Sequence, residues 1–224
     1  MTLVPVRNIF KKVRQTYDTV DKQVGAQAAR MKATCTRGCA GCCYQLVSAS
    51  FIEALLIADF LLRNRKPEEL ETITQKLRTA SARFRFSQNR TSLFLEKQPC
   101  PFLVAGEKPF TGECSIYAVR PSTCRMHYVV SDPKLCEPTQ SYLCDIIDMR
   151  GPAAEVVRVI SGGSEVLASY GPLEPLVLHA LEVSQNENAT PSLLELEYWR
   201  RRIMAMISHD RAVQEANGIR DKYA

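Results

Sequence analysis

Nine cysteines are the residues of this sequence whose type and spacing could do chemistry. Four of them fall within residues 35–43, with the spacing C-x3-C-x2-C-C. Thiolates bind zinc and the iron of iron–sulfur clusters, and either kind of centre commonly takes four of them. Eight of the nine sulfurs would therefore complete two such centres. The candidate metal ligands are Cys35, Cys39, Cys42, Cys43, Cys100, Cys114, Cys124, Cys136 and Cys144.

Packing in a hydrophobic core is the alternative role for a free cysteine. It would suit one or two of the nine. However, the segment CTRGCAGCC contains no other large apolar residue with which four cysteines could form a core. We therefore expect the clustered cysteines to bind metal. Gly38 and Gly41 lie between them and let the backbone turn tightly enough to direct several sulfurs to one point.

Cys42 and Cys43 are adjacent in the chain, which restricts how they can bind. Neighbouring side chains diverge by about 100° on a helix and point to opposite faces of a strand. We expect the pair to serve two metal ions, or two corners of a polynuclear centre. Soft sulfur ligands suit both zinc and iron, so the ligand type leaves the metal open. Arg37, Arg120 and Arg125 could offset the excess negative charge of the thiolates, or could be solvated surface residues.

The composition is typical of a folded globular protein, with 46% hydrophobic and 24% charged residues over 224 positions. The net charge of +5 is too small and too scattered to indicate nucleic-acid binding. The amino-terminal segment lacks the pattern of a secretory signal, and the most apolar stretch, residues 51–62, is shorter than the ~20 residues that cross a bilayer. We expect a cytoplasmic protein without membrane contact. Thiols stay reduced there, so disulfides are the weaker interpretation.

Apolar residues at helical spacing predict a long amphipathic helix from Pro5 to about Met31. Its buried stripe is expected to contain Phe10, Val13, Tyr17, Val20, Val24, Ala28 and Met31. Ser50 and Glu53 have the spacing of a capping box, which predicts a second, buried helix to about Leu62. A third is expected from about Pro67, with Leu70, Ile73, Leu77 and Phe84 facing inward.

Prolines and glycines interrupt residues 99–138 every few positions, which excludes long helices there. A bound metal is a natural means of ordering such a segment. Further along, the sequence SGGS at residues 161–164 could be a hairpin turn or a break between helices. The stretches LEPLVLHALEV and 192–215 have helical patterns, and the second would bury Leu196, Trp199, Ile203 and Met206.

These patterns predict a predominantly α fold, a single compact helical domain with an irregular metal-binding segment rich in proline and cysteine and room for a short β-hairpin. Residues 1–33 would form the amino-terminal amphipathic helix. Residues 34–150 would form the cysteine-cluster metal-binding domain, and residues 151–224 a carboxy-terminal helical region packed on it.

Three motifs together resemble a known family: CTRGCAGCC, CPFL at residues 100–103 and CSIYAVRPSTCR at residues 114–125. They are similar to the YkgJ-type cysteine-cluster family, described as a zinc- or iron-chelating domain, over about residues 33–128. The first spacing here is one residue longer than the family's C-x2-C-x2-C-C. The resemblance implies metal ligation by the seven cysteines from Cys35 to Cys124. Cys136 and Cys144 lie beyond the shared motifs and could be ligands or core residues, and His127 could be a nitrogen ligand or a structural histidine.

Three functions are compatible with these observations. The first is a metal-binding protein with a structural or redox role, in which the cysteines hold an iron–sulfur cluster or two zinc ions. The second follows from a similarity of the cluster to flagellin lysine N-methylase, which implies an S-adenosylmethionine-dependent protein lysine N-methyltransferase. The third is an oxygen- or redox-sensing protein that engages a protein partner. No Gly-rich nucleotide loop or known hydrolase motif supports an enzyme of a familiar class.

Overall fold

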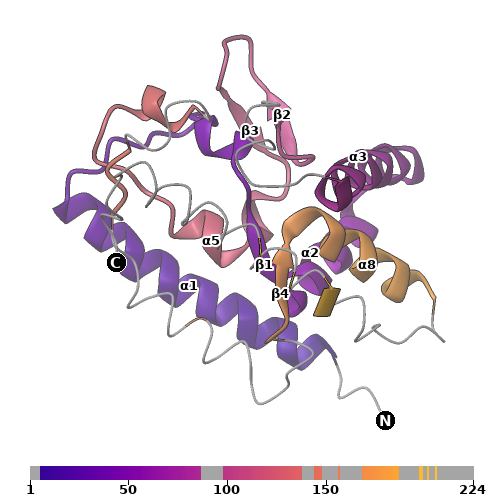
Figure 1. Ribbon diagram of the computed structural model, residues 1–224. Coiled ribbons are helices and arrows are strands. Elements are labelled where there is room, and N and C mark those ends of the chain that lie inside the picture. The colour runs from indigo at the N-terminus through magenta and orange to yellow at the C-terminus, as the bar shows by residue number, and fades with distance from the viewer. Residues whose placement is uncertain are drawn as a thin grey trace.

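The computed structural model describes residues 6–86, 98–137, 144–147, 156, 168–186, 197–198, 201 and 205. Within these ranges the chain is predominantly α-helical, with two small antiparallel sheets of two strands each (Figure 1). In chain order the elements, with η for a 3-10 helix, are α1 (Val6–Arg30), η1 (Gly41–Tyr44), β1 (Ser48–Ser50), α2 (Phe51–Asn64), α3 (Pro67–Phe86), β2 (Leu103–Ala105), β3 (Gly112–Cys114), η2 (Tyr117–Val119), α5 (Ser122–Arg125), η3 (Pro133–Cys136), β4 (Tyr170–Pro172) and α8 (Leu173–Gln185).

The predicted amphipathic helix is α1, and its apolar stripe packs on the rest of the molecule. The buried members of this stripe are Val13, Tyr17, Val20, Val24 and Ala28. Phe10 is partly buried, and Pro5 lies outside the described residues. The prediction for Met31 was wrong, because its side chain is 48% exposed. The helix ends at Arg30, one residue before Met31, and the backbone of Lys32 leaves the helical conformation with a positive φ of 55°. Met31 therefore lies beyond the end of the stripe.

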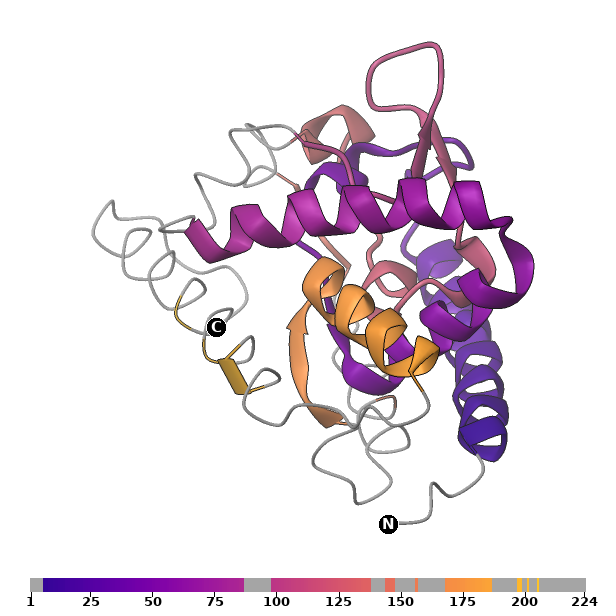
Figure 2. The ribbon, with the colours of Figure 1, turned by 90° about the vertical axis from the view of Figure 1, so that its right-hand side faces the viewer.

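Helix α2 lies at the centre of the core, as its nearly uniform apolar character predicted. The Ser50–Glu53 capping box is present at its start. Helix α8 packs against both α2 and α3, and α3 lies across α8 (Figure 2). The strands β1 and β4 pair in antiparallel register, with Ser48 opposite Pro172. Because β1 leads directly into α2 and β4 into α8, this pairing brings the two helices together.

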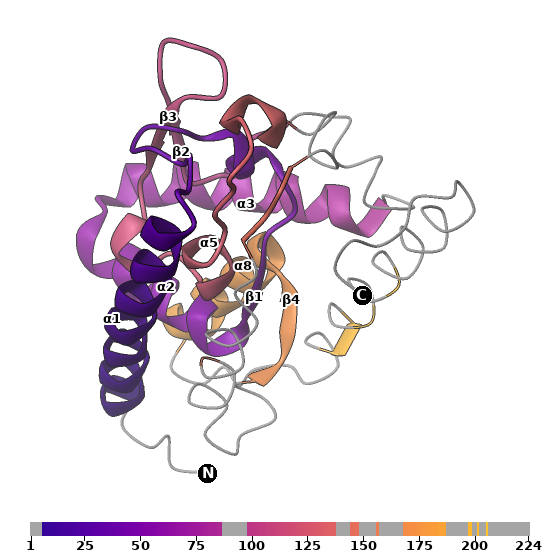
Figure 3. The same cartoon turned by 90° about the vertical axis from the view of Figure 1, so that its left-hand side faces the viewer.

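The proline-rich segment contains only short elements, as expected. Strands β2 and β3 form an antiparallel hairpin with Leu103 opposite Cys114, and Figure 3 shows this hairpin projecting from the body of the molecule. The SGGS segment and most of residues 192–215, with Leu196, Trp199, Ile203 and Met206, lie outside the described residues. Among the helices that the structure describes, none has the length and apolar character needed to cross a bilayer.

Candidate metal centre

All nine cysteines lie within the described residues, and none is joined in a disulfide. They come from η1 and the loop before it, from the hairpin and α5, and from η3 and the chain after it. Their electrostatic influence on one another divides eight of them into two groups. We call Cys43, Cys100, Cys114 and Cys124 the inner group, and Cys35, Cys39, Cys136 and Cys144 the outer group.

The inner group is held by backbone contacts between η1 and the hairpin. The backbone N–H of Cys100 donates to the carbonyl of Cys43 at 2.7 Å, and the N–H of Leu103 donates to the carbonyl of Cys100 at 2.9 Å. Leu103 in turn lies opposite Cys114 in the sheet. These bonds bring three cysteines together although 71 positions separate Cys43 from Cys114 in the sequence (114 minus 43).

Burial dominates the electrostatics of the inner group. It raises the pKa of Cys100 and of Cys124 well above the ordinary value of a thiol. The negative charges of Glu174 and Cys124 raise the pKa of Cys100 further. Those of Cys42 and Cys114 raise the pKa of Cys124 further. Backbone hydrogen bonds from Phe102 to Cys100 and from Ile116 to Cys114 act in the opposite direction and lower the pKa of each thiol. The thiolates of this group therefore need a nearby cation.

The outer group joins the start of the cysteine loop to η3. The sulfurs of Cys136 and Cys144 lie 3.7 Å apart, and both residues are buried. The backbone N–H of Val129 donates to the sulfur of Cys35 at 3.4 Å. Burial is the largest cause of the raised pKa of Cys136, followed by the charge of Cys144, and the charges of Cys42 and Cys35 also contribute.

Cys42 lies between the two groups. Its charge raises the pKa of Cys35 and Cys136 in the outer group and of Cys124 in the inner group, in each case after burial as the largest cause. Cys43 donates a side-chain hydrogen bond to Cys42, which lowers the pKa of Cys42 to about 7 and raises that of Cys43. The expectation that this adjacent pair serves two metal ions, or two corners of one centre, stays a prediction.

Two glycines allow the cysteine loop to take this path, each for a different reason. Gly38 has a left-handed backbone, with φ at 86°, which side chains disfavour. Gly41 lies against η3, where a Cβ atom would come within 2.8 Å of the Cβ of Cys136. Gln45 reinforces this contact, because its side-chain amide donates to the carbonyl of Cys136 at 3.1 Å. The close approach of η1 to η3 therefore brings Cys42 near the outer group.

The three arginines that the sequence suggested as counter-charges have different roles. Arg37 forms an exposed ion pair with Glu113. The guanidinium of Arg120 stacks 4.2 Å from the ring centroid of Tyr117, and its buried Nε has no hydrogen-bond partner among the described residues. Its positive charge lowers the pKa of Cys42, although the hydrogen bond from Cys43 is the larger cause. The positive charge of Arg120 also lowers the pKa of Cys114 and of Cys124, although burial, the largest cause, raises both; Arg125 acts on Cys114 in the same direction as Arg120.

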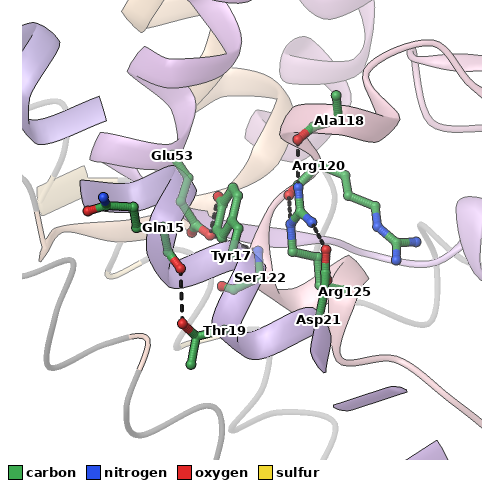
Figure 4. A network of polar contacts seen from close by, with 9 residues as sticks. All are labelled: Gln15, Tyr17, Thr19, Asp21, Glu53, Ala118, Arg120, Ser122 and Arg125. Carbon is green, nitrogen blue, oxygen red and sulfur yellow. Dashed lines mark hydrogen bonds and ion pairs between the residues drawn. The ribbon is translucent and has the colours of Figure 1, made fainter. Parts of the chain in front are cut away.

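Arg125 serves the scaffold instead (Figure 4). Its guanidinium is 5% exposed, pairs with Asp21 on α1 and lies 4.0 Å from the ring centroid of Tyr17. It also donates to the backbone carbonyls of Ala118 and Arg120. Arg125 therefore fixes the loop before α5, and with it Cys124, against α1.

A buried carboxylate completes this support. Glu53 is fully buried and accepts hydrogen bonds from the Tyr17 hydroxyl at 2.9 Å and from the backbone N–H of Ser122 at 2.7 Å (Figure 4). It also accepts from the backbone and side chain of Ser50. One carboxylate thus connects α1, α2 and the first residue of α5, two positions before Cys124. The sequence indicated only its capping role.

Buried polar atoms without partners mark what the site could still hold. Among the described residues, the side-chain nitrogen Nε2 of His127 and the oxygen Oε2 of Glu174 have no hydrogen-bond partner. Burial lowers the pKa of His127, which favours the neutral imidazole that binds metals. Sequence reasoning missed Glu174, because an acid in the first turn of a helix is ordinarily a surface residue.

The donor set has the chemistry of a thiophilic metal site, with nine thiols, backbone N–H donors to sulfur and the partly buried Arg120. Among the described residues, no three cysteine, histidine, aspartate or glutamate side chains already converge closely enough to hold a metal ion. Metal binding would therefore draw the side chains of each group inward. Backbone contacts join Cys43, Cys100 and Cys114 of the inner group, and Cys35, Cys136 and Cys144 of the outer group share one cluster. The backbone of Cys39 pairs with Thr111 beside the hairpin.

Comparison with known proteins agrees with this geometry. The model of the CxxCxxCC family, described as "Putative zinc- or iron-chelating domain", matches residues 34–145, half of the chain. The chain belongs to the CxxCxxCC family. This match reaches Cys136 and Cys144, which the motifs recognised in the sequence did not cover. Metal chelation is thus the chemistry that membership in the CxxCxxCC family supports. No curated protein and no solved structure matches the chain.

Proposed function

We propose that this protein binds two zinc ions, one at the inner group and one at the outer group, and that the ions hold the proline-rich segment in its fold. The observation that carries the proposal is the division of eight thiols into two sets of four, with Cys42 between them. A tetrahedral zinc ion takes four ligands of this kind. Cys42, the ninth thiol, belongs to neither set of four.

The spacing of one sulfur pair supports a tetrahedral ion in the outer group. Four sulfurs about 2.3 Å from a central zinc ion lie roughly 3.8 Å from one another. Cys136 and Cys144 have sulfurs 3.7 Å apart, so one edge of the tetrahedron is already formed. Cys35 lies beside this pair, since the three residues share a cluster with Val129.

The structural role follows from the short elements of residues 98–137. The longest helices in this segment, α5 and η3, have four residues each, so few local hydrogen bonds order its backbone. Metal ions that join this segment to η1 would contribute binding free energy directly to folding. A chelator should accordingly lower the melting temperature of the zinc-loaded protein. The proposal assigns the protein to a reducing compartment such as the cytoplasm, where its thiols persist.

Metal analysis of single-site variants tests the proposal. The full chain, purified with a reductant and loaded with zinc, should contain about two zinc ions. Cys124→Ser and Cys144→Ser should each retain about one, because each removes a ligand from a different group. Replacing zinc by cobalt would count the thiolate ligands that remain, through thiolate-to-cobalt absorption. A chain without bound metal, or variants that each keep both ions, would contradict two independent centres.

An iron–sulfur cluster is the alternative for the same ligands, and the same preparation distinguishes it. Anaerobic purification would then give a brown protein with iron and acid-labile sulfide. A colourless protein with two zinc ions would select the proposal over the cluster.

A redox-sensing role is the second candidate function, and the Cys136–Cys144 contact favours it. Two sulfurs at 3.7 Å can join when an oxidant removes two electrons, which would release a metal ion from the outer group. Engagement of a protein partner after this release belongs to the same hypothesis. The methyltransferase hypothesis stays a prediction, and calorimetry with S-adenosylmethionine tests it.

A further inference from the structure

Phe110 has a backbone conformation that its residue type disfavours. It is the third residue of the turn at 108–111, between β2 and β3, and its φ is positive at 56°. The backbone N–H and the hydroxyl of Thr111 both donate to the carbonyl of Lys108, at 3.2 and 2.7 Å. Pro109 at the second position and a positive φ at the third are typical of a type II turn, which favours glycine at the third. A phenylalanine there is strained, so other contacts must hold it in place.

The contacts that hold Phe110 come from the cysteine loop. Its carbonyl accepts a hydrogen bond from the backbone N–H of Ala40 at 2.8 Å. Its ring lies edge-on to the ring of Tyr44, with centroids 5.0 Å apart and planes inclined by 74°, a favourable arrangement of two aromatic rings. Ala40 precedes η1 and Tyr44 is the last residue of η1. Phe110 therefore holds η1 at both ends.

The backbone that follows Phe110 extends this contact. Cys39 pairs with Thr111 in an antiparallel bridge, and the N–H of Gly112 donates to the carbonyl of Gly38 at 2.9 Å. The start of the cysteine loop thus lies along the hairpin where β3 begins. The position of the turn therefore determines the position of the loop.

One further hydrogen bond connects Phe110 to a proposed zinc ligand. The backbone N–H of Cys43 donates to the carbonyl of Ala40 at 3.0 Å. Ala40 thus donates to Phe110 and accepts from Cys43, while Tyr44, the ring partner of Phe110, follows Cys43 in the chain. Cys100 holds Cys43 separately, through the carbonyl of Cys43. Phe110 is accordingly a second anchor for this member of the inner group.

We propose that Phe110 is a positioning residue for the zinc ion of the inner group, because it holds η1 where Cys43 can bind. This inference rests on the proposed function, since it concerns one of the two ions assigned there. A ligand that is already in place loses less conformational freedom when the metal binds, so affinity increases. The strained turn is then the condition under which the ring and carbonyl of Phe110 both reach the cysteine loop.

Substitutions at position 110 separate the effect of the ring from that of the backbone. Phe110→Gly and Phe110→Ala both remove the ring, but only glycine relaxes the positive φ. In the full chain carrying Cys144→Ser, which retains the inner ion, both should weaken zinc binding roughly two- to tenfold in a chelator competition, the range expected for an aromatic pair. Phe110→Tyr keeps the ring and should bind as tightly as the parent. Val104→Ala is the matched control, because Val104 belongs to the same hairpin and is 60% exposed.

The ring partner provides an independent comparison. Tyr44→Leu should weaken zinc binding as much as Phe110→Ala does, whereas Tyr44→Phe should not change it. Because both substitutions remove the same contact, the double variant should lose little more affinity than either single variant. Full additivity of the two losses would show that the pair does not act as a unit and would contradict the proposal.

The stability of the metal-free protein distinguishes positioning from packing alone. Without metal, Phe110→Gly should melt at a higher temperature than Phe110→Ala, because alanine keeps the strained turn. Both should gain less stability from zinc than the parent, since the gain depends on affinity. A residue that only packs would shift the metal-free and zinc-loaded forms equally. Unchanged zinc affinity in Phe110→Gly and Phe110→Ala would overturn this inference and leave the proposed function intact, whereas failure of the wild type to bind zinc would overturn both.

Discussion

The thiol of Cys43 donates a hydrogen bond to the sulfur of its neighbour Cys42, and the two residues therefore ionise at very different pH. Adjacent cysteines in a regular helix or strand would diverge. Here they belong to the short 3-10 helix η1, whose ends are fixed by the hairpin and by η3. The contact is the largest cause of the lowered pKa of Cys42.

The first prediction concerns the reactivity of Cys42 in the metal-free, reduced protein. Its pKa is lowered to about 7, so the thiolate persists down to about pH 7 and becomes protonated below it. Only the thiolate is nucleophilic, so alkylation by iodoacetamide should slow roughly tenfold per pH unit below this value. Peptide mass spectrometry at short reaction times measures the modification of each cysteine.

Cys43→Ser provides the comparison for this prediction. A serine hydroxyl can still donate to Cys42, whereas Cys43→Ala removes the donor. The apparent pKa of Cys42 should therefore rise in Cys43→Ala more than in Cys43→Ser. Equal pKa values in both variants would show that Cys43 does not set the acidity of Cys42.

Local features of the site were predictable from the sequence, because they depend on neighbouring residues. Gly38 does take the left-handed backbone that a tight turn in the cysteine loop requires. The convergence of several sulfurs on shared ions, which the spacing of Cys35 to Cys43 indicated, stays a prediction. The capping box at Ser50 was predicted for the same reason. The residues that determine each of these features lie within a few positions of one another in the sequence.

The position of Glu174 could not be predicted, because it depends on contacts between distant segments. Its burial follows from strand pairing across more than 100 residues, between Ser48 and Pro172, which sets α8 against α2. The second role of Glu53 is of the same kind, since Tyr17 and Ser122 reach it only after α1 and α5 have packed. The exposure of Met31 was not predicted for another reason, because hydrophobic periodicity does not show where a helix ends.

The second prediction concerns Arg120 as a cation beside the thiolates of the site. Arg120→Gln should raise the apparent pKa of Cys42, because a positive charge near the thiolate is lost. Zinc binding at the inner group should weaken, since fewer charges offset the thiolates. Arg37→Gln is the matched control, because the Arg37 side chain is 93% exposed. Identical alkylation profiles in the two variants would exclude this role for Arg120.

The third prediction concerns the buried carboxylate of Glu53. All four of its hydrogen-bond partners are donors, and a glutamine amide would place its own donors against some of them. Glu53→Gln should lower the free energy of unfolding by about 3 kcal/mol. Tyr17→Phe, which removes one donor, should cost about 1 kcal/mol.

Thr19→Ala is the control for the Glu53 variants in urea unfolding. Thr19 also lies on α1 and bonds only to the exposed carbonyl of Gln15 (Figure 4). Its removal should change stability by less than about 0.5 kcal/mol. A Glu53→Gln protein as stable as Thr19→Ala would mean that the carboxylate does not hold α5 in place.

The fourth prediction concerns oxidation of the outer group. Diamide accepts two electrons and two protons from a pair of thiols, which then form one S–S bond. Cys136 and Cys144 should cross-link first in the metal-free protein, because their sulfurs need to approach only from 3.7 Å to about 2 Å. Bound zinc should slow the reaction, since both sulfurs would then be ligands. Non-reducing peptide mapping identifies the bond, and Cys144→Ser should abolish it. Equal rates with and without zinc would remove Cys136 and Cys144 from the outer site.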